Sequence, residues 1–233
     1  MDTADRVRAG DRRALARLIT AIEAGDPAAE PVFAQLVATP SAGRRVGVTG
    51  PPGAGKSTLV NAMVEELRAR GDSVAVLAVD PSSPITGGAL LGDRIRMQDH
   101  IDDDGVYIRS MASRGHLGGL APAAGRTIAL LSRAGFDMVI VETVGVGQSE
   151  IEVMDLVDVV VLVIGPDWGD QIQASKAGIV EIADVFVINK GDRPGVDTVH
   201  RALLESLGET EAPVLVTTAI TGEGVEALVD AVR

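Results

Sequence analysis

The nine residues from Gly50 to Thr58 constrain the fold of this 233-residue chain more than any other segment. A short apolar run ends just before them, and an amphipathic pattern begins at Lys56. They read Gly50-Pro51-Pro52-Gly53-Ala54-Gly55-Lys56-Ser57-Thr58, which fits the pattern Gly-x4-Gly-Lys-Ser/Thr. When a glycine-rich loop joins a strand to a helix in this order, the backbone N–H groups of the loop can surround a phosphate. We therefore predict a P-loop, in which all nine residues bind nucleotide phosphates.

Two side chains of this loop have specific expected roles. Lys56 brings a positive charge to the β- and γ-phosphates, and Ser57 offers a hydroxyl ligand to Mg²⁺. Farther along the chain, Glu142 ends a run of apolar residues and is expected at the carboxyl end of a buried strand, where it would meet the metal. Gly145 follows closely enough to bring its N–H to the γ-phosphate. We predict Lys56 and Glu142 as catalytic residues, and Ser57 and Glu142 as metal ligands.

A second motif, Asn189-Lys190-Gly191-Asp192, predicts the base. Asp192 can accept hydrogen bonds from the ring N–H and the exocyclic amine of guanine together, whereas adenine has no such pair. Lys190 would lie along the base or ribose, and Asn189 would brace the P-loop. The later run Thr218-Ala219-Ile220 completes the pocket, with the Ala219 N–H facing the guanine oxygen. GTP and GDP, with Mg²⁺, are therefore the expected ligands.

The apolar runs alternate with helical patterns from residue 45 onward. Because several runs are apolar at nearly every position, they indicate a mostly parallel sheet with helices on both faces. The sequence thus predicts an α/β P-loop NTPase fold, with a helical extension at residues 1–43 and a GTPase domain at 44–233. Helical patterns at 11–24 and 32–37 form the extension. The expected strands are 45–49, 73–79, 106–109, 137–142, 158–164, 184–189 and 214–218, and the expected helices are 56–70, 123–134, 171–177, 195–207 and 224–232.

Composition excludes several other functions. A formal net charge of −12 argues against a nucleic-acid partner, because phosphate backbones require a basic face. The longest apolar run, 159–164, is too short to span a bilayer, and no signal peptide precedes the first charges. The chain has no Cys, and its three His residues lack the spacing of metal ligands. We expect a cytoplasmic protein without a membrane or nucleic-acid partner.

Several stretches between the two motifs are not required for nucleotide binding in general. Together they closely resemble the methylmalonyl-CoA mutase-associated GTPases, the MeaB/ArgK family that includes the human MMAA protein. The resemblance extends from about Gly10 to the last residue. It is carried by Val79-Asp80-Pro81-Ser82-Ser83, Thr86-Gly87-Gly88, Leu91-Gly92-Asp93-Arg94-Ile95-Arg96-Met97, Arg114-Gly115-His116-Leu117-Gly118-Gly119-Leu120 and Glu142-Thr143-Val144-Gly145-Val146-Gly147-Gln148-Ser149-Glu150.

The resemblance implies a metallochaperone-type GTPase that gates cofactor loading and protection in an adenosylcobalamin-dependent acyl-CoA mutase. It also implies that Asp80 and Asp93 lie near Mg²⁺ and the γ-phosphate. Asp93 or Gln148 would orient the attacking water. A further switch at 167–178, with Asp170 and Lys176 as its charged members, would communicate with the mutase.

Other interpretations stay open at this point. The chain could be a nucleotide-dependent small-molecule kinase, a nickel-insertion GTPase, or a binding module whose GTP-bound state is the signal. Family members continue into a C-terminal helical arm that supports dimerisation, and this sequence ends at Arg233, so a homodimer is possible but not expected through that arm. Trp168, the one Trp of the chain, could contact a partner or pack in the core.

Overall fold

The computed structural model describes residues 2–41, 43–80, 100, 102–112, 122–143, 154–168 and 182–233. Within these ranges, seven parallel strands form one sheet in the order β3-β2-β4-β1-β5-β6-β7. The strands are β1 (Arg44–Thr49), β2 (Val74–Asp80), β3 (Val106–Ala112), β4 (Met138–Thr143), β5 (Val159–Ile164), β6 (Val185–Asn189) and β7 (Val214–Thr217). All seven expected strands are present, and the predicted α/β P-loop NTPase fold is confirmed.

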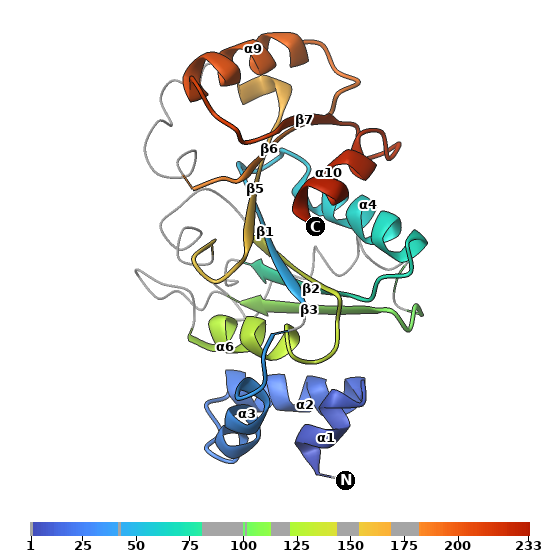
Figure 1. Cartoon of the computed structure of the whole chain (residues 1–233), viewed down its shortest axis with the longest axis vertical. Coiled ribbons are helices and arrows are strands. Elements are labelled where there is room, and N and C mark those ends of the chain that lie inside the picture. The colour runs from blue at the N-terminus through green and yellow to red at the C-terminus, as the bar shows by residue number, and fades with distance from the viewer. Residues whose placement is uncertain are drawn as a thin grey trace, which may run out of the picture.

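Helices cover both faces of the sheet (Figure 1). Helices α4 (Lys56–Ala69) and α10 (Val225–Val232) share one apolar core with the sheet, while α6 (Pro122–Leu131) shares another with its opposite face. Helix α9 (Val196–Leu207) and the short 3₁₀ turn η2 (Pro166–Trp168) pack on β5 and β6. β4 and β5 are buried at every position, which agrees with the continuous apolar runs in their sequence.

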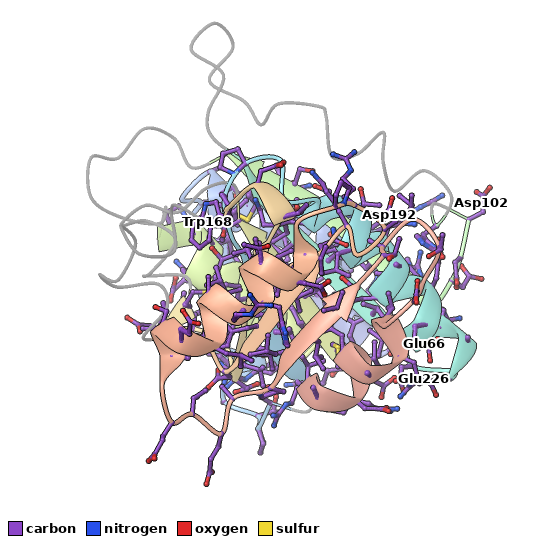
Figure 2. All side chains as sticks on the ribbon, turned by 90° about the horizontal axis from the view of Figure 1, so that it is seen from above. Glu66, Asp102, Trp168, Asp192 and Glu226 are labelled. Atoms are coloured by element: carbon purple, nitrogen blue, oxygen red, sulfur yellow. The ribbon has the colours of Figure 1, made fainter. Side chains whose placement is uncertain are left out.

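Helices α4 and α10 lie side by side and are joined by Arg70, the C-cap residue that follows α4. Its guanidinium donates to the Glu66 carboxylate at 2.7 Å and to the Asp230 carboxylate at 2.5 Å. Figure 2 shows Glu66 and Glu226 at neighbouring positions on this edge. The pairing holds the helix that follows the P-loop against the last helix of the chain.

Three helices precede the sheet: α1 (Thr3–Arg8), α2 (Arg12–Glu23) and α3 (Ala29–Val37). They pack against one another and on α6, so they extend the core beneath that face (Figure 1). The Asp11 carboxylate accepts the N–H of Ala14 at 2.9 Å and thereby caps the start of α2. Whether residues 1–43 form a unit separate from 44–233 stays a prediction.

The helix positions differ from the sequence-based expectations in three places. α1 was not expected, because a six-residue helix that buries only Ala4 and Val7 is too short to show a periodic pattern. α3 begins at Ala29, three residues before the expected start, and α6 ends at Leu131, three residues before the expected end. The helix expected at 171–177 lies outside the described residues.

Parallel pairing places the carboxyl ends of all strands at one edge of the sheet, which is where open α/β sheets bind ligands. β1 lies between β4 and β5, so the loop after β1 emerges from the centre of this edge. In the register of the sheet, Val48 of β1 pairs with Glu142 of β4, and Ile188 of β6 pairs with Val216 of β7. The two nucleotide motifs therefore meet at the same edge.

Candidate nucleotide site

The loop after β1 has a backbone that its glycines make possible. Gly50 has φ +142°, and a Cβ there would lie 1.9 Å from the carbonyl oxygen of Val163. Gly55, with φ +92°, immediately precedes the first residue of α4. Backbone N–H groups at the start of a helix are available to bind an anion, and the helix dipole favours negative charge there. The loop therefore has the form that a phosphate site requires.

Lys56 begins α4 and turns back over this loop. Its ammonium donates hydrogen bonds to the carbonyl oxygens of Gly50 at 2.8 Å and Pro51 at 3.1 Å. Only 7% of the residue is exposed. The one buried lysine among the described residues thus has its charge at the start of the loop.

Ser57 and Glu142 come together although they are 85 positions apart in the chain. The Ser57 hydroxyl donates to Glu142 Oε1 at 2.6 Å, and both residues are buried. Glu142 lies at the carboxyl end of β4, where the apolar run had indicated it. A hydroxyl and a carboxylate, both oxygen ligands, therefore lie beside the first turn of α4.

Asn189 connects the two nucleotide motifs. Its Nδ2 donates to the carbonyl oxygen of Ala54 at 3.0 Å, which is the bracing contact expected from the sequence. Its Oδ1 accepts hydrogen bonds from the Thr217 hydroxyl at 3.1 Å and from the Ala219 N–H at 3.2 Å. One buried amide therefore joins the P-loop, the end of β6 and the segment after β7.

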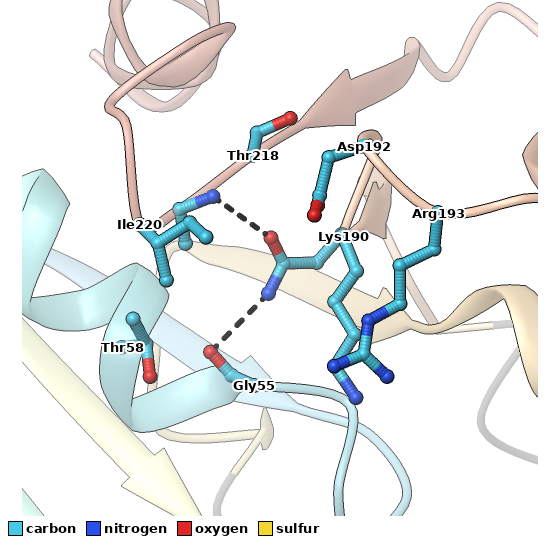
Figure 3. Close-up of a pocket in the computed structure, with 9 residues that line it drawn as sticks. Gly55, Thr58, Lys190, Asp192, Arg193, Thr218 and Ile220 are labelled. Atoms are coloured by element: carbon cyan, nitrogen blue, oxygen red, sulfur yellow. Dashed lines mark hydrogen bonds between the residues drawn. The ribbon is translucent and has the colours of Figure 1, made fainter.

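A pocket of about 110 Å³ opens beside Asn189 (Figure 3). Lys190, one of its walls, has φ +64°, and its ammonium donates to the carbonyl oxygen of Gly53 at 2.5 Å. Arg193 also lines the pocket, although the Asn-Lys-x-Asp pattern gives no reason to expect it there. The lining residues are Gly55, Thr58, Asn189, Lys190, Asp192, Arg193, Thr218, Ala219 and Ile220. The pocket thus collects residues from both motifs and from the segment after β7.

The other candidate residues belong to β2 or to segments outside the described ranges. Asp80 ends β2 at the same sheet edge. Asp93, Gly145, Gln148, Asp170 and Lys176 lie outside the described residues.

Trp168 and His100 are both buried. Trp168 is 6% exposed and packs with apolar residues of β5, β6 and α9. This packing contradicts a role for Trp168 as an exposed partner contact. His100 is 8% exposed, in agreement with a packing role.

Comparison with known proteins decides the family. A family model described as "Methylmalonyl Co-A mutase-associated GTPase MeaB" matches residues 15–233. The chain belongs to the MeaB family of P-loop GTPases. A relative described as a putative GTPase from Pyrococcus horikoshii is 48% identical to this MeaB-family chain. The alignment is 238 positions long and covers 98% of the chain and 75% of the relative.

Two further relatives extend the comparison. The mouse protein described as "Methylmalonic aciduria type A homolog, mitochondrial" is 42% identical over 199 residues, which cover 81% of this chain but 48% of the mouse protein. A crystal structure described as an LAO/AO transport system kinase superposes with a TM-score of 0.77 at 32% identity, and the match covers 99% of this chain and 72% of the other. The fold of this MeaB-family chain is therefore that of a solved relative.

Two properties of the described part of the chain concern membranes and metals. None of its helices has the length and apolar character needed to cross a membrane. In the same ranges, His, Cys, Asp and Glu side chains do not gather in groups of three or more that could hold a metal.

Proposed function

We propose that this MeaB-family GTPase binds Mg²⁺·GTP at the carboxyl edge of its sheet and acts as a GTP-dependent chaperone of an adenosylcobalamin-dependent acyl-CoA mutase. The observation that carries the nucleotide site is the set of contacts made by Asn189. Because one side chain binds both the P-loop and the segment after β7, the phosphate and base sites have a fixed separation. A single nucleotide would then contact both.

The phosphates would lie in the loop from Gly50 to Thr58. Lys56 would exchange its hydrogen bonds to the loop carbonyls for phosphate oxygens, and its charge would stabilise the negative charge that develops as the γ-phosphate is cleaved. The backbone N–H groups at the start of α4 would add further donors. Water attacks the γ-phosphate in line in this scheme, and Asp93 or Gln148 would orient that water. Gly145 would donate its N–H to the γ-phosphate.

Mg²⁺ fits the chemistry of Ser57 and Glu142. The ion prefers oxygen ligands and usually keeps several of its waters, so a site with few protein ligands suits it. When bound, it would neutralise charge on the β- and γ-phosphates. Glu142 is longer than the Asp found at this position in many GTPases, and it would act through a metal-bound water. Asp80 and Asp93 are proposed to complete the surroundings of the ion.

The base would occupy the pocket beside Asn189. Asp192 would accept both guanine donors, and the Lys190 stem would cover one face of the ring. Thr218 and Ile220 would line the opposite side. The Ala219 N–H, which donates to Asn189 Oδ1 in this structure, would share or transfer its hydrogen bond to the guanine oxygen.

The client protein is proposed from the family alone. The family description names methylmalonyl-CoA mutase, and the mouse relative's name refers to methylmalonic aciduria. We propose that GTP turnover times cofactor loading and protection of such a mutase. Asp170 and Lys176 would carry the nucleotide state to the client.

A GTPase assay with and without a purified adenosylcobalamin-dependent acyl-CoA mutase tests this role. Slow GTP hydrolysis that rises when the mutase is added, together with nucleotide-dependent binding of the two proteins, is expected. If the mutase neither binds nor changes the rate in any nucleotide state, the chaperone proposal fails. Phosphorylation of a small molecule with ATP as donor would instead favour a kinase.

A further inference from the structure

Arg193 is brought to the nucleotide pocket by a short, rigid turn. The N–H of Arg193 donates to the carbonyl oxygen of Lys190 at 3.0 Å, and the N–H of Gly191 donates to the carbonyl oxygen of Thr217 at 2.9 Å. A Cβ on Gly191 would approach Val216 Cγ1 to 2.9 Å, so the turn lies directly against β7. Lys190 and Arg193, at the first and last positions of this turn, are consequently held in place together.

Both side chains present positive charge to the same pocket. The Lys190 ammonium is fixed to the P-loop by its hydrogen bond to Gly53, and Figure 3 shows the Arg193 guanidinium ending on the same side of the pocket. Within the described part of the chain, Arg193 makes no ion pair and no side-chain hydrogen bond. Neighbouring like charges repel unless an anion lies between them. The arrangement is notable in a chain whose net charge is −12.

We propose that Arg193 binds a phosphate oxygen of the bound guanine nucleotide. This inference rests on the proposed nucleotide site and adds a residue that the two sequence motifs do not include. The planar guanidinium can donate two parallel hydrogen bonds to phosphate, which a neutral base does not require. Arg193 therefore raises the affinity of the site for guanine nucleotides but not for guanosine, which has no phosphate.

Calorimetric titration of the full chain with GDP and with guanosine tests the proposal. We expect Arg193→Gln to weaken GDP binding about three- to tenfold, because the contact is exposed, and to leave guanosine binding unchanged. Arg193→Lys, which keeps the charge, should recover part of the loss. The GDP affinity of Arg193→Gln should also depend less on salt than that of the wild type. Arg201, an exposed arginine on α9, supplies the matched control Arg201→Gln, which should bind GDP as the wild type does.

Two results would overturn the inference while leaving the proposed function intact. One is equal weakening of GDP and guanosine binding by Arg193→Gln, which would mean that the guanidinium stacks on the base. The other is wild-type GDP affinity in that variant. Failure of the wild-type chain to bind GDP at all would overturn the proposed function itself, and this inference with it.

Discussion

The hydroxyl of Ser57 donates a 2.6 Å hydrogen bond to Glu142 Oε1, joining the first turn of α4 to the end of β4. Both side chains are buried, and the sheet register places Glu142 beside Val48, just before the P-loop. A carboxylate at this position is costly to bury unless it is hydrogen-bonded or near a cation. These two side chains are the ones at which we propose that Mg²⁺ binds.

Glu142→Gln should raise the Mg²⁺ requirement of GTP hydrolysis. The amide keeps an oxygen that can accept from Ser57 but removes the negative charge that attracts the ion. We expect the Mg²⁺ concentration for half-maximal hydrolysis to rise about tenfold, equivalent to one charge-assisted interaction. GDP affinity measured without Mg²⁺ should not change. An unaltered Mg²⁺ dependence would show that Glu142 has no part in holding the ion.

Lys56→Ala should reduce the rate constant for GTP hydrolysis by about 100-fold or more, since removal of one preorganised charge from a reacting centre has costs of this order. Single-turnover hydrolysis of GTP is the measurement, with thermal unfolding to verify that the variant folds. Lys190 does not supply the missing charge, because its ammonium is held at Gly53. Hydrolysis at the wild-type rate would refute the catalytic scheme.

Asn189→Ala should destabilise the fold as well as weaken nucleotide binding. The substitution removes an acceptor for Thr217 and Ala219 and a donor to Ala54, all in a buried setting. Unpaired buried polar groups cost about 1–3 kcal/mol each, so we expect the free energy of unfolding in urea to fall by at least about 2 kcal/mol.

Thr221→Ala provides the control for that variant. Thr221 lies on the same segment after β7, is exposed, and its hydroxyl donates only to the carbonyl oxygen of Thr218 at 3.1 Å. Its loss should change the free energy of unfolding by less than about 0.5 kcal/mol. Similar effects of the two substitutions would contradict the bracing role of Asn189.

Stability should decline in acid through Asp158, at the amino end of β5. The side chain of Arg45, which hydrogen-bonds to it, lowers the pKa of Asp158 below its ordinary 3.8. Because the pKa is lower in the folded state, the ionised carboxylate stabilises the fold fully at pH values above the unfolded-state pKa. This stabilisation is lost as the pH falls through the folded-state pKa.

We expect the free energy of unfolding of the wild type, measured in urea between about pH 7 and about pH 3, to fall most steeply below pH 3.8. Asp158→Asn should flatten that part of the curve. Glu209→Gln, at an exposed site, should retain the wild-type slope. If Asp158→Asn keeps the wild-type acid dependence, the Arg45 contact contributes nothing to stability.

The strands and the motif residues of the described site could be predicted because their signals are local. Continuous apolar runs identify β4 and β5, and the parallel arrangement then brings Glu142 to the edge where Gly50–Thr58 also lies. The same reasoning predicts that Asn189 reaches the P-loop, because β1 and β6 end at one edge. Topology and a few motif residues together determine most of the site.

Other features depend on packing that the sequence does not display. Arg193 enters the pocket because the turn at Lys190 has a positive φ angle and lies against β7, and no residue pattern encodes that approach. The Ala219 N–H, which the sequence predicts to face the guanine oxygen, also donates to Asn189 Oδ1. The core position of Trp168 depends on β5, β6 and α9, which surround it and come from separate parts of the chain.

The central claim, that Asp192 selects guanine at this site, is tested most directly by calorimetric titration of the wild type and Asp192→Asn with GDP, ADP and xanthosine diphosphate. The wild type should bind GDP and prefer it to ADP by about 10⁴-fold. Xanthine carries a carbonyl where guanine has its amine, so the side-chain amide of the variant could donate to that carbonyl while still accepting from the ring N–H. The variant should consequently lose affinity for GDP and gain affinity for xanthosine diphosphate. Equal binding of GDP and ADP by the wild type, or unchanged GDP affinity in the variant, would contradict the account.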